Sequence, residues 1–140
     1  MSKQEKKDQT QELIKETAKN LFFVQGKFDA TTQEIADEAG INRTLINYYF
    51  RSRDNLIQIV FDEAQKVEKE KSEIIQDSNL AFKDKIKLFI EGSLSTSLQY
   101  PYLETYIVTQ INKGNCHKKE IEEEYKKKML KNIQTEMDLG

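Results

Sequence analysis

The sequence of 140 residues contains few of the residues that cross-link or interrupt a chain: one cysteine, one proline, five glycines and one histidine. A single cysteine excludes an internal disulfide and favours a reducing compartment. Scarce proline and glycine, together with 33% charged residues, favour helices over a sheet. No apolar run approaches the ~18 residues of a membrane span, and the polar start MSKQEKKDQTQE is unlike a signal peptide. The composition therefore predicts a soluble, cytoplasmic, helical protein.

The sequence also lacks an excess of either charge. The net charge is −2, and residues 1–60 hold nine Lys or Arg against nine Asp or Glu. This balance disfavours loose, charge-driven binding to a polyanion. It does not exclude specific binding to nucleic acid, because a few well-placed cations suffice when the acidic side chains face away.

Catalytic and metal-binding patterns are equally scarce. The single histidine, His117, follows the single cysteine, Cys116, so the pair supplies at most two ligands and zinc would need carboxylates, which is atypical. No nucleophile, base and orienting group can be assigned from spacing. We therefore expect neither an enzyme nor a resident metal or cofactor.

The chain does contain a helix-turn-helix pattern at residues 31–50. Thr31 and Glu34 have the spacing of a capping box at the start of the first helix. Gly40 supplies the left-handed conformation that ends this helix. Asn42 is a strong N-cap for the second helix. Two helices joined by a tight glycine turn form the helix-turn-helix unit.

The second helix, expected over residues 43–50, has two different faces at 100° per residue. The inward face is apolar and comprises Ile46, Tyr49 and Phe50. The outward face comprises Thr44, Asn47 and Tyr48, with Arg43 and Leu45 at its margins. These side chains suit DNA, since arginine binds guanine or phosphate, asparagine binds adenine, threonine and leucine contact a thymine methyl, and tyrosine binds phosphate. The alternative is a three-helix core whose polar face merely meets water.

A third helix follows at once. Ser52 is expected to cap it, which places Arg53 at an amide-rich N-terminus pointing toward a phosphate. Residues 52–77 contain neither glycine nor proline. The helix is therefore expected to continue far beyond the motif, as a lever or as a solvated strut.

Residues 11–64 resemble the DNA-binding domain of the tetracycline-repressor (TetR) family of bacterial regulators. The matching positions are Ala18, Leu21, Phe22, Gly26, Phe28, Thr32, Ile35, Ala36, Ala39, Gly40, the run Tyr48–Phe50, Ser52, Arg53 and Leu56. The resemblance implies an all-α protein with a three-helix DNA-binding head, a ligand-sensing body and dimeric binding to an operator. Family members commonly touch DNA at the positions held here by Thr32, Arg43, Thr44, Tyr48, Tyr49 and Arg53.

Two residues depart from the family pattern. Leu45 stands where threonine or a similar polar residue is usual, and Asn47 stands where tyrosine is usual. Leu45 either contacts a thymine methyl or is exposed to water. Asn47 either pairs bidentately with adenine or is exposed to water. The operator sequence is therefore left open.

The whole chain divides into a flexible arm at residues 1–8, a head at 9–55 and a partial ligand-binding and dimerisation body at 56–140. The arm is expected to be a solvated, disordered tail, and the alternative is an arm that touches a DNA groove or phosphate. Helices are expected at residues 9–25, 52–77, 80–98, 101–112 and 117–139. In the resembling family the long connecting helix transmits ligand-driven motion to the DNA-binding heads.

The helices at residues 80–98 and 101–112 combine small and aromatic side chains, which either pack closely or line a small-molecule pocket. Because the resembling family binds its effector among such helices, we place a pocket for an unidentified small apolar or aromatic effector at Phe89, Ser93, Tyr106 and Gln110. Family members usually continue for two further helices that pair in a homodimer. This sequence stops at Gly140, so we expect either a truncated product or a dimer formed in another way.

The sequence as a whole predicts a ligand-responsive transcriptional repressor that binds an inverted-repeat DNA operator as a dimer. The alternative is a helical protein-interaction module in which the same head grips a protein partner.

Overall fold

The computed structural model describes residues 2–114 and, beyond them, residues 123, 126–127, 130–131, 133–134 and 137. Every regular element among these residues is helical, which confirms the all-α fold class. The elements are α1 (Lys3–Lys19), a π-helical turn η1 (Asn20–Val24), α2 (Thr32–Ala39), α3 (Arg43–Phe50), α4 (Arg53–Asp77), α5 (Phe82–Gln99) and α6 (Leu103–Asn112).

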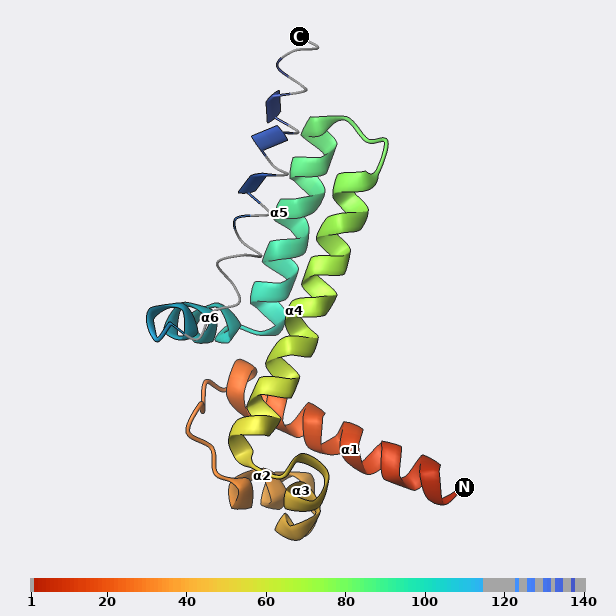
Figure 1. Ribbon diagram of the computed structural model, residues 1–140, viewed down its shortest axis with the longest axis vertical. Coiled ribbons are helices and arrows are strands. Elements are labelled where there is room, and N and C mark those ends of the chain that lie inside the picture. Colours follow the sequence, from red (N-terminus) through yellow and green to blue (C-terminus); the bar gives the residue numbers. More distant parts are fainter. Residues whose placement is uncertain are drawn as a thin grey trace.

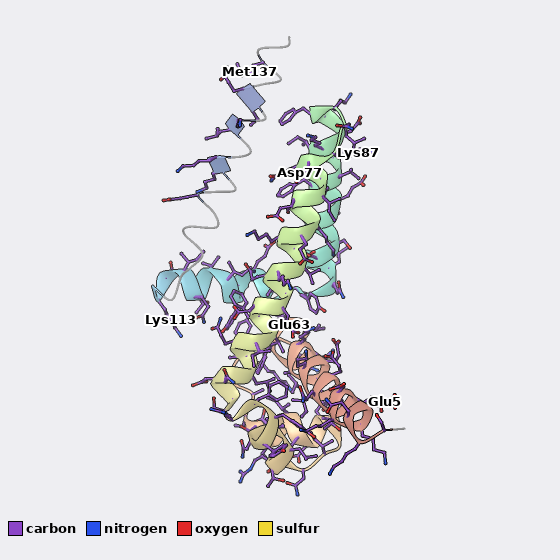
Figure 2. The ribbon with its side chains drawn as sticks, turned by 45° about the vertical axis from the view of Figure 1, so that its right-hand side comes forward. Glu5, Glu63, Asp77, Lys87, Lys113 and Met137 are labelled. Carbon is purple, nitrogen blue, oxygen red and sulfur yellow. The ribbon has the colours of Figure 1, made fainter. Side chains whose placement is uncertain are left out.

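One long helix, α4, connects the two ends of the molecule (Figure 1). At one end α1, α2 and α3 gather around its first turns and form the head. Beyond the head α4 pairs with the returning α5 as a hairpin, and α6 crosses near the point where α4 leaves the head. Figure 2 shows Glu63 near this point, with Asp77 and Lys87 toward the far end of the hairpin. The predicted connecting helix is confirmed, and its 25 residues span about 38 Å.

The hydrophobic core lies in the head. Its largest fully buried side chains are Phe22, Phe23, Ile14, Ile35, Ile46, Leu56 and Val60. By contrast α5 has no buried residue, and its Ile90, Leu94 and Leu98 are exposed. The head is therefore the most closely packed part of the described residues.

The chain is helical from Lys3, where a flexible arm over residues 1–8 was expected. The Glu5 N–H donates to the Ser2 hydroxyl at 3.2 Å, and the Ser2 N–H donates to the Glu5 carboxylate at 2.8 Å. This reciprocal capping box satisfies two backbone donors that an uncapped helix leaves open. It extends α1 two turns beyond the predicted start at Gln9.

At its other end α1 does not run as an α-helix to Gln25, as expected, but passes into η1 after Lys19. Gly26 ends the segment with φ +73°, and a Cβ there would approach the ring of Tyr102 to 2.9 Å. The Tyr102 N–H donates to the carbonyl oxygen of Phe23 at 2.9 Å. The π-helical turn thus joins the head to the segment that leads into α6.

The connection between α4 and α5 also differs from expectation. The residues 77–79 end α4 as predicted, but α5 begins at Phe82 behind Ala81, which makes no side-chain cap. The Ser78 hydroxyl instead donates backward to the Ile75 carbonyl at 2.6 Å, so it serves the end of α4. Likewise α6 begins at Leu103, two residues after Pro101.

Candidate nucleic-acid interface

Side-chain caps fix both helices of the predicted motif. The Thr31 hydroxyl accepts the Glu34 N–H at 3.1 Å, and Gly40 ends α2 in the left-handed conformation with φ +69°. The Asn42 side-chain oxygen accepts the N–H of Thr44 at 3.0 Å and its hydroxyl at 2.9 Å. The predicted bounds of α3 are confirmed, and two hydrogen bonds from Thr44 to the Asn42 side chain hold its first turn.

The faces of α3 are arranged largely as its periodicity predicts. Ile46 is fully buried and Phe50 is 4% exposed, so this side of the helix anchors it in the core. Leu45 and Tyr49 are half-buried, as is Thr32 at the start of α2. The solvent-facing side chains are Arg43, Thr44, Asn47 and Tyr48.

The two adjacent tyrosines of α3 have different surroundings. Tyr48 is 69% exposed, whereas Tyr49 packs against the core. Their rings meet edge to face at 5.0 Å between centroids. The ammonium of Lys7, from α1, lies 5.8 Å from the Tyr48 centroid. The sequence analysis missed Lys7, because residues 1–8 were expected to be a flexible arm.

The short link between α3 and α4 sets the orientation of α3 relative to α4. Arg51 has φ +70°, a conformation that residues with a side chain rarely adopt. The Asn55 side-chain amide donates to the Phe50 carbonyl at 2.8 Å, and the Asn55 N–H donates to the Ser52 hydroxyl at 3.1 Å. The predicted Ser52 cap is confirmed. Strain such as that at Arg51 persists where surrounding contacts hold the backbone in place.

Arg53 is held by contacts within the head. Its Nε donates to the Ala30 carbonyl, its Nη1 lies 3.2 Å from the Asp54 carboxylate, and its guanidinium lies 5.5 Å from the centroid of the Phe22 ring. The side chain keeps 27% of its surface exposed. Arg53 therefore connects the loop before α2 to the start of α4. From the sequence it was expected only to point toward a phosphate.

Ion pairs tie α1 to the long helix α4. The Lys15 ammonium lies 2.8 Å from carboxylate oxygens of both Glu12 and Glu63, and Lys19 lies 3.9 Å from Glu63. Burial opposes the charge of Lys15, but its hydrogen bonds to the carboxylates of Glu12 and Glu63 and their negative charges outweigh this effect and raise the pKa of the ammonium. Because this folded-state pKa is raised, the contribution to stability is present at neutral pH and is lost only as the pH rises through it.

One of the four residues placed in an effector pocket belongs to the core cluster of the head. Tyr106 is 7% exposed, and its ring packs against Phe23, Phe28 and Phe61 at 5.0–5.6 Å between centroids. Burial raises the pKa of its hydroxyl, against the opposing charge of Arg53. The reason is the position of α6, which lies beside η1 where the head meets the hairpin (Figure 1).

The other three predicted pocket residues are divided between α5 and α6. Phe89 and Ser93 are on α5, half-buried and exposed respectively, and Gln110 is half-buried on α6. Their role in binding an effector stays a prediction.

Two further sequence features concern other classes of site. Among the residues that the structure describes, no group of three potential ligands is placed to hold a metal ion. Cys116 and His117 lie outside those residues. Most of the helix expected at residues 117–139 also lies outside them. Within the same part of the chain, none of the helices has the length and apolar character needed to cross a bilayer.

Comparison with known proteins bears on the head. Residues 14–60 match the family model described as bacterial regulatory proteins, tetR family. The match includes the capped pair α2 and α3, the strained link after α3 and the start of α4. No curated protein and no solved structure gives a significant match to the chain.

Proposed function

We propose that this chain is a ligand-responsive repressor that binds an inverted-repeat operator as a dimer. The proposal starts from the match of residues 14–60 to the family model of the tetR bacterial regulatory proteins. The solvent-facing side of α3 is the observation that carries the proposal. Four side chains able to contact bases or phosphates stand on it, while Ile46 and Phe50 anchor the opposite side. Such a face is preorganised for binding, since the backbone beneath it is already fixed.

The dimensions of α3 suit the major groove. An α-helix with its side chains is about 10–12 Å across, and the major groove of B-DNA is about 12 Å wide. In helix-turn-helix proteins the N-terminal residues of the second helix contact base edges. Here these are Arg43 and Thr44, followed by Asn47 one turn later. Asparagine pairs bidentately with adenine, and a half-buried Leu45 offers an apolar surface to a thymine methyl.

In this proposal α4 links effector binding to repression and its relief. Two heads that read half-sites about one helical turn apart, or a multiple of it, require a fixed separation. An effector bound beside the hairpin would change that separation through α4, and it would release DNA if it binds the non-DNA-bound state more tightly. We place its contacts at Phe89, Ser93 and Gln110, and we place the protein in the cytoplasm, where an operator is accessible. In this proposal the chain is a regulator and not an enzyme.

Selection of binding sites from a random DNA library, at physiological salt and with this chain, tests the proposal. We expect an inverted repeat to be enriched. Enrichment of single half-sites would contradict the dimer but retain DNA recognition. Folded protein that enriches no sequence would overturn the proposal and favour the protein-interaction alternative.

Asn47→Ala should relax the sequence preference at one position of each half-site. The expected loss is about 1–3 kcal/mol of discrimination against the wrong base, because one bidentate contact to adenine is removed. Repeating the selection with the variant measures it, and Gln58→Ala, which removes an exposed amide on α4, is the matched control. A consensus that is the same for Asn47→Ala and the parent chain would exclude the adenine contact.

A further inference from the structure

We propose that the first two turns of α1 form a second DNA contact, in which Lys3 and Lys7 bind backbone phosphates beside the groove that α3 enters. This inference rests on the proposed DNA-binding function and extends its interface to an element outside the helix-turn-helix pair. The partner is double-stranded DNA, recognised through the charge of its phosphates.

The contact between Lys7 and Tyr48 places α1 at the edge of the DNA-facing surface. The Lys7 ammonium lies 5.8 Å from the centroid of the Tyr48 ring, and that ring is 69% exposed on the outward side of α3. A phosphate bound by the Tyr48 hydroxyl would therefore lie near Lys7 of α1. An ammonium has three donors, so stacking on a ring leaves it able to bind an oxygen.

The helical register of α1 places Lys3 on the same side. At 100° per residue, Lys3, Lys7, Ile14 and Ala18 fall within about 60° of arc. Ile14 and Ala18 are fully buried against the head. Figure 1 shows that the N-terminal half of α1 projects past the rest of the head. In this projecting part, the face of α1 that continues the buried stripe carries Lys3 and Lys7 and is therefore basic. The Ser2–Glu5 capping box holds this overhanging part in helical form.

The acidic side chains of α1 lie on the opposite side of the helix. Glu5, Asp8, Glu12 and Glu16 fall within about 80° of arc, centred roughly opposite the lysine stripe. They bond within α1: Glu5 to Ser2, Asp8 to Gln4, and the other two to Lys15 and Lys19. Residues 1–60 have no net charge, yet the uneven distribution gives the α3 side of α1 a positive character.

The salt dependence of binding tests the inference. The probe is the duplex selected from the random library, and the variant is Lys3→Gln with Lys7→Gln. Each phosphate contact that is lost should flatten the slope of log K against log salt by about 0.9, so the double variant should lose close to two units. The selected consensus should stay unchanged, because phosphate contacts carry no sequence information directly.

Lys66→Gln with Lys69→Gln is the matched control, since it removes two lysines from the hairpin part of α4, where they pair with Glu70 and Glu73. Its slope should equal that of the parent chain. Lys7→Arg in the parent background should retain the slope, because it preserves the charge.

The outcomes separate this inference from the proposed function. A parent chain that selects no duplex would overturn both. Specific binding by the parent chain with an unaltered slope in the double variant would overturn the α1 contact alone. A changed consensus with an unaltered slope would also overturn it, and would show that Lys7 only positions Tyr48.

Discussion

Phe23→Ala is expected to lower the free energy of unfolding by about 3–5 kcal/mol, the range for removing a fully buried phenylalanine. The Phe23 side chain is 0% exposed and packs against the rings of Phe22, Tyr100 and Tyr106 at 5.6–6.4 Å between centroids. Its loss leaves a cavity at the place where the π-helical turn meets α6. The effect should therefore reach both the head and the segment that leads into α6.

Urea denaturation followed by circular dichroism measures this loss. Leu98→Ala is the control, because a leucine that is 75% exposed should change stability by less than about 0.5 kcal/mol. If Phe23→Ala does not fold, Phe23→Leu provides a milder cavity with an intermediate loss. A change below about 1 kcal/mol in Phe23→Ala would contradict the packing described for this junction.

Arg53→Ala is expected to act on stability and on DNA binding at once. Removing the charged donor to the Ala30 carbonyl, together with the stack on Phe22, should lower the free energy of unfolding by about 1.5–3 kcal/mol. The salt slope of DNA binding should also fall by about one unit, because the remaining exposed part of the guanidinium is proposed to bind a phosphate. Denaturation and binding titrations on the same preparation give both quantities.

Arg53→Lys separates the two effects. A lysine keeps the charge but lacks the planar guanidinium that donates from Nε and stacks on a ring. We expect it to preserve the salt slope and to lose stability. Arg43→Ala provides the converse comparison. Because Arg43 is exposed on α3, its replacement should lower the salt slope without a loss of stability. An unchanged slope in Arg53→Ala would assign this side chain wholly to the internal clamp.

Local chemistry made α2 and α3 predictable from the sequence. Both helices begin at a residue whose side chain accepts a nearby backbone N–H, and the glycine between them adopts the left-handed conformation that only glycine adopts readily. These signals act over a few residues, so no tertiary information was needed. The start of α1 could have been predicted in the same way, because Ser2 and Glu5 have capping-box spacing, but a flexible arm was expected there.

Contacts between distant segments were not predictable. The orientation of Arg53 depends on a carbonyl 23 residues earlier in the chain, and the π-helical turn presents the Phe23 carbonyl to the N–H of Tyr102. The spacing of Leu103 and Tyr106 places both side chains on one face of a helix. It did not show whether that face meets the head or the hairpin, because periodicity identifies a buried face and not its partner.

The packing of α6 has a practical consequence for anyone who wishes to transplant this head. Leu103 and Tyr106 are 3% and 7% exposed within the same core cluster as the side chains of α1 and α4. A cassette cut from the N-terminal part alone would uncover the rings of Phe23 and Phe61 and become prone to aggregation. A usable graft must therefore carry residues 100–107 along, or replace the uncovered aromatic rings with polar side chains.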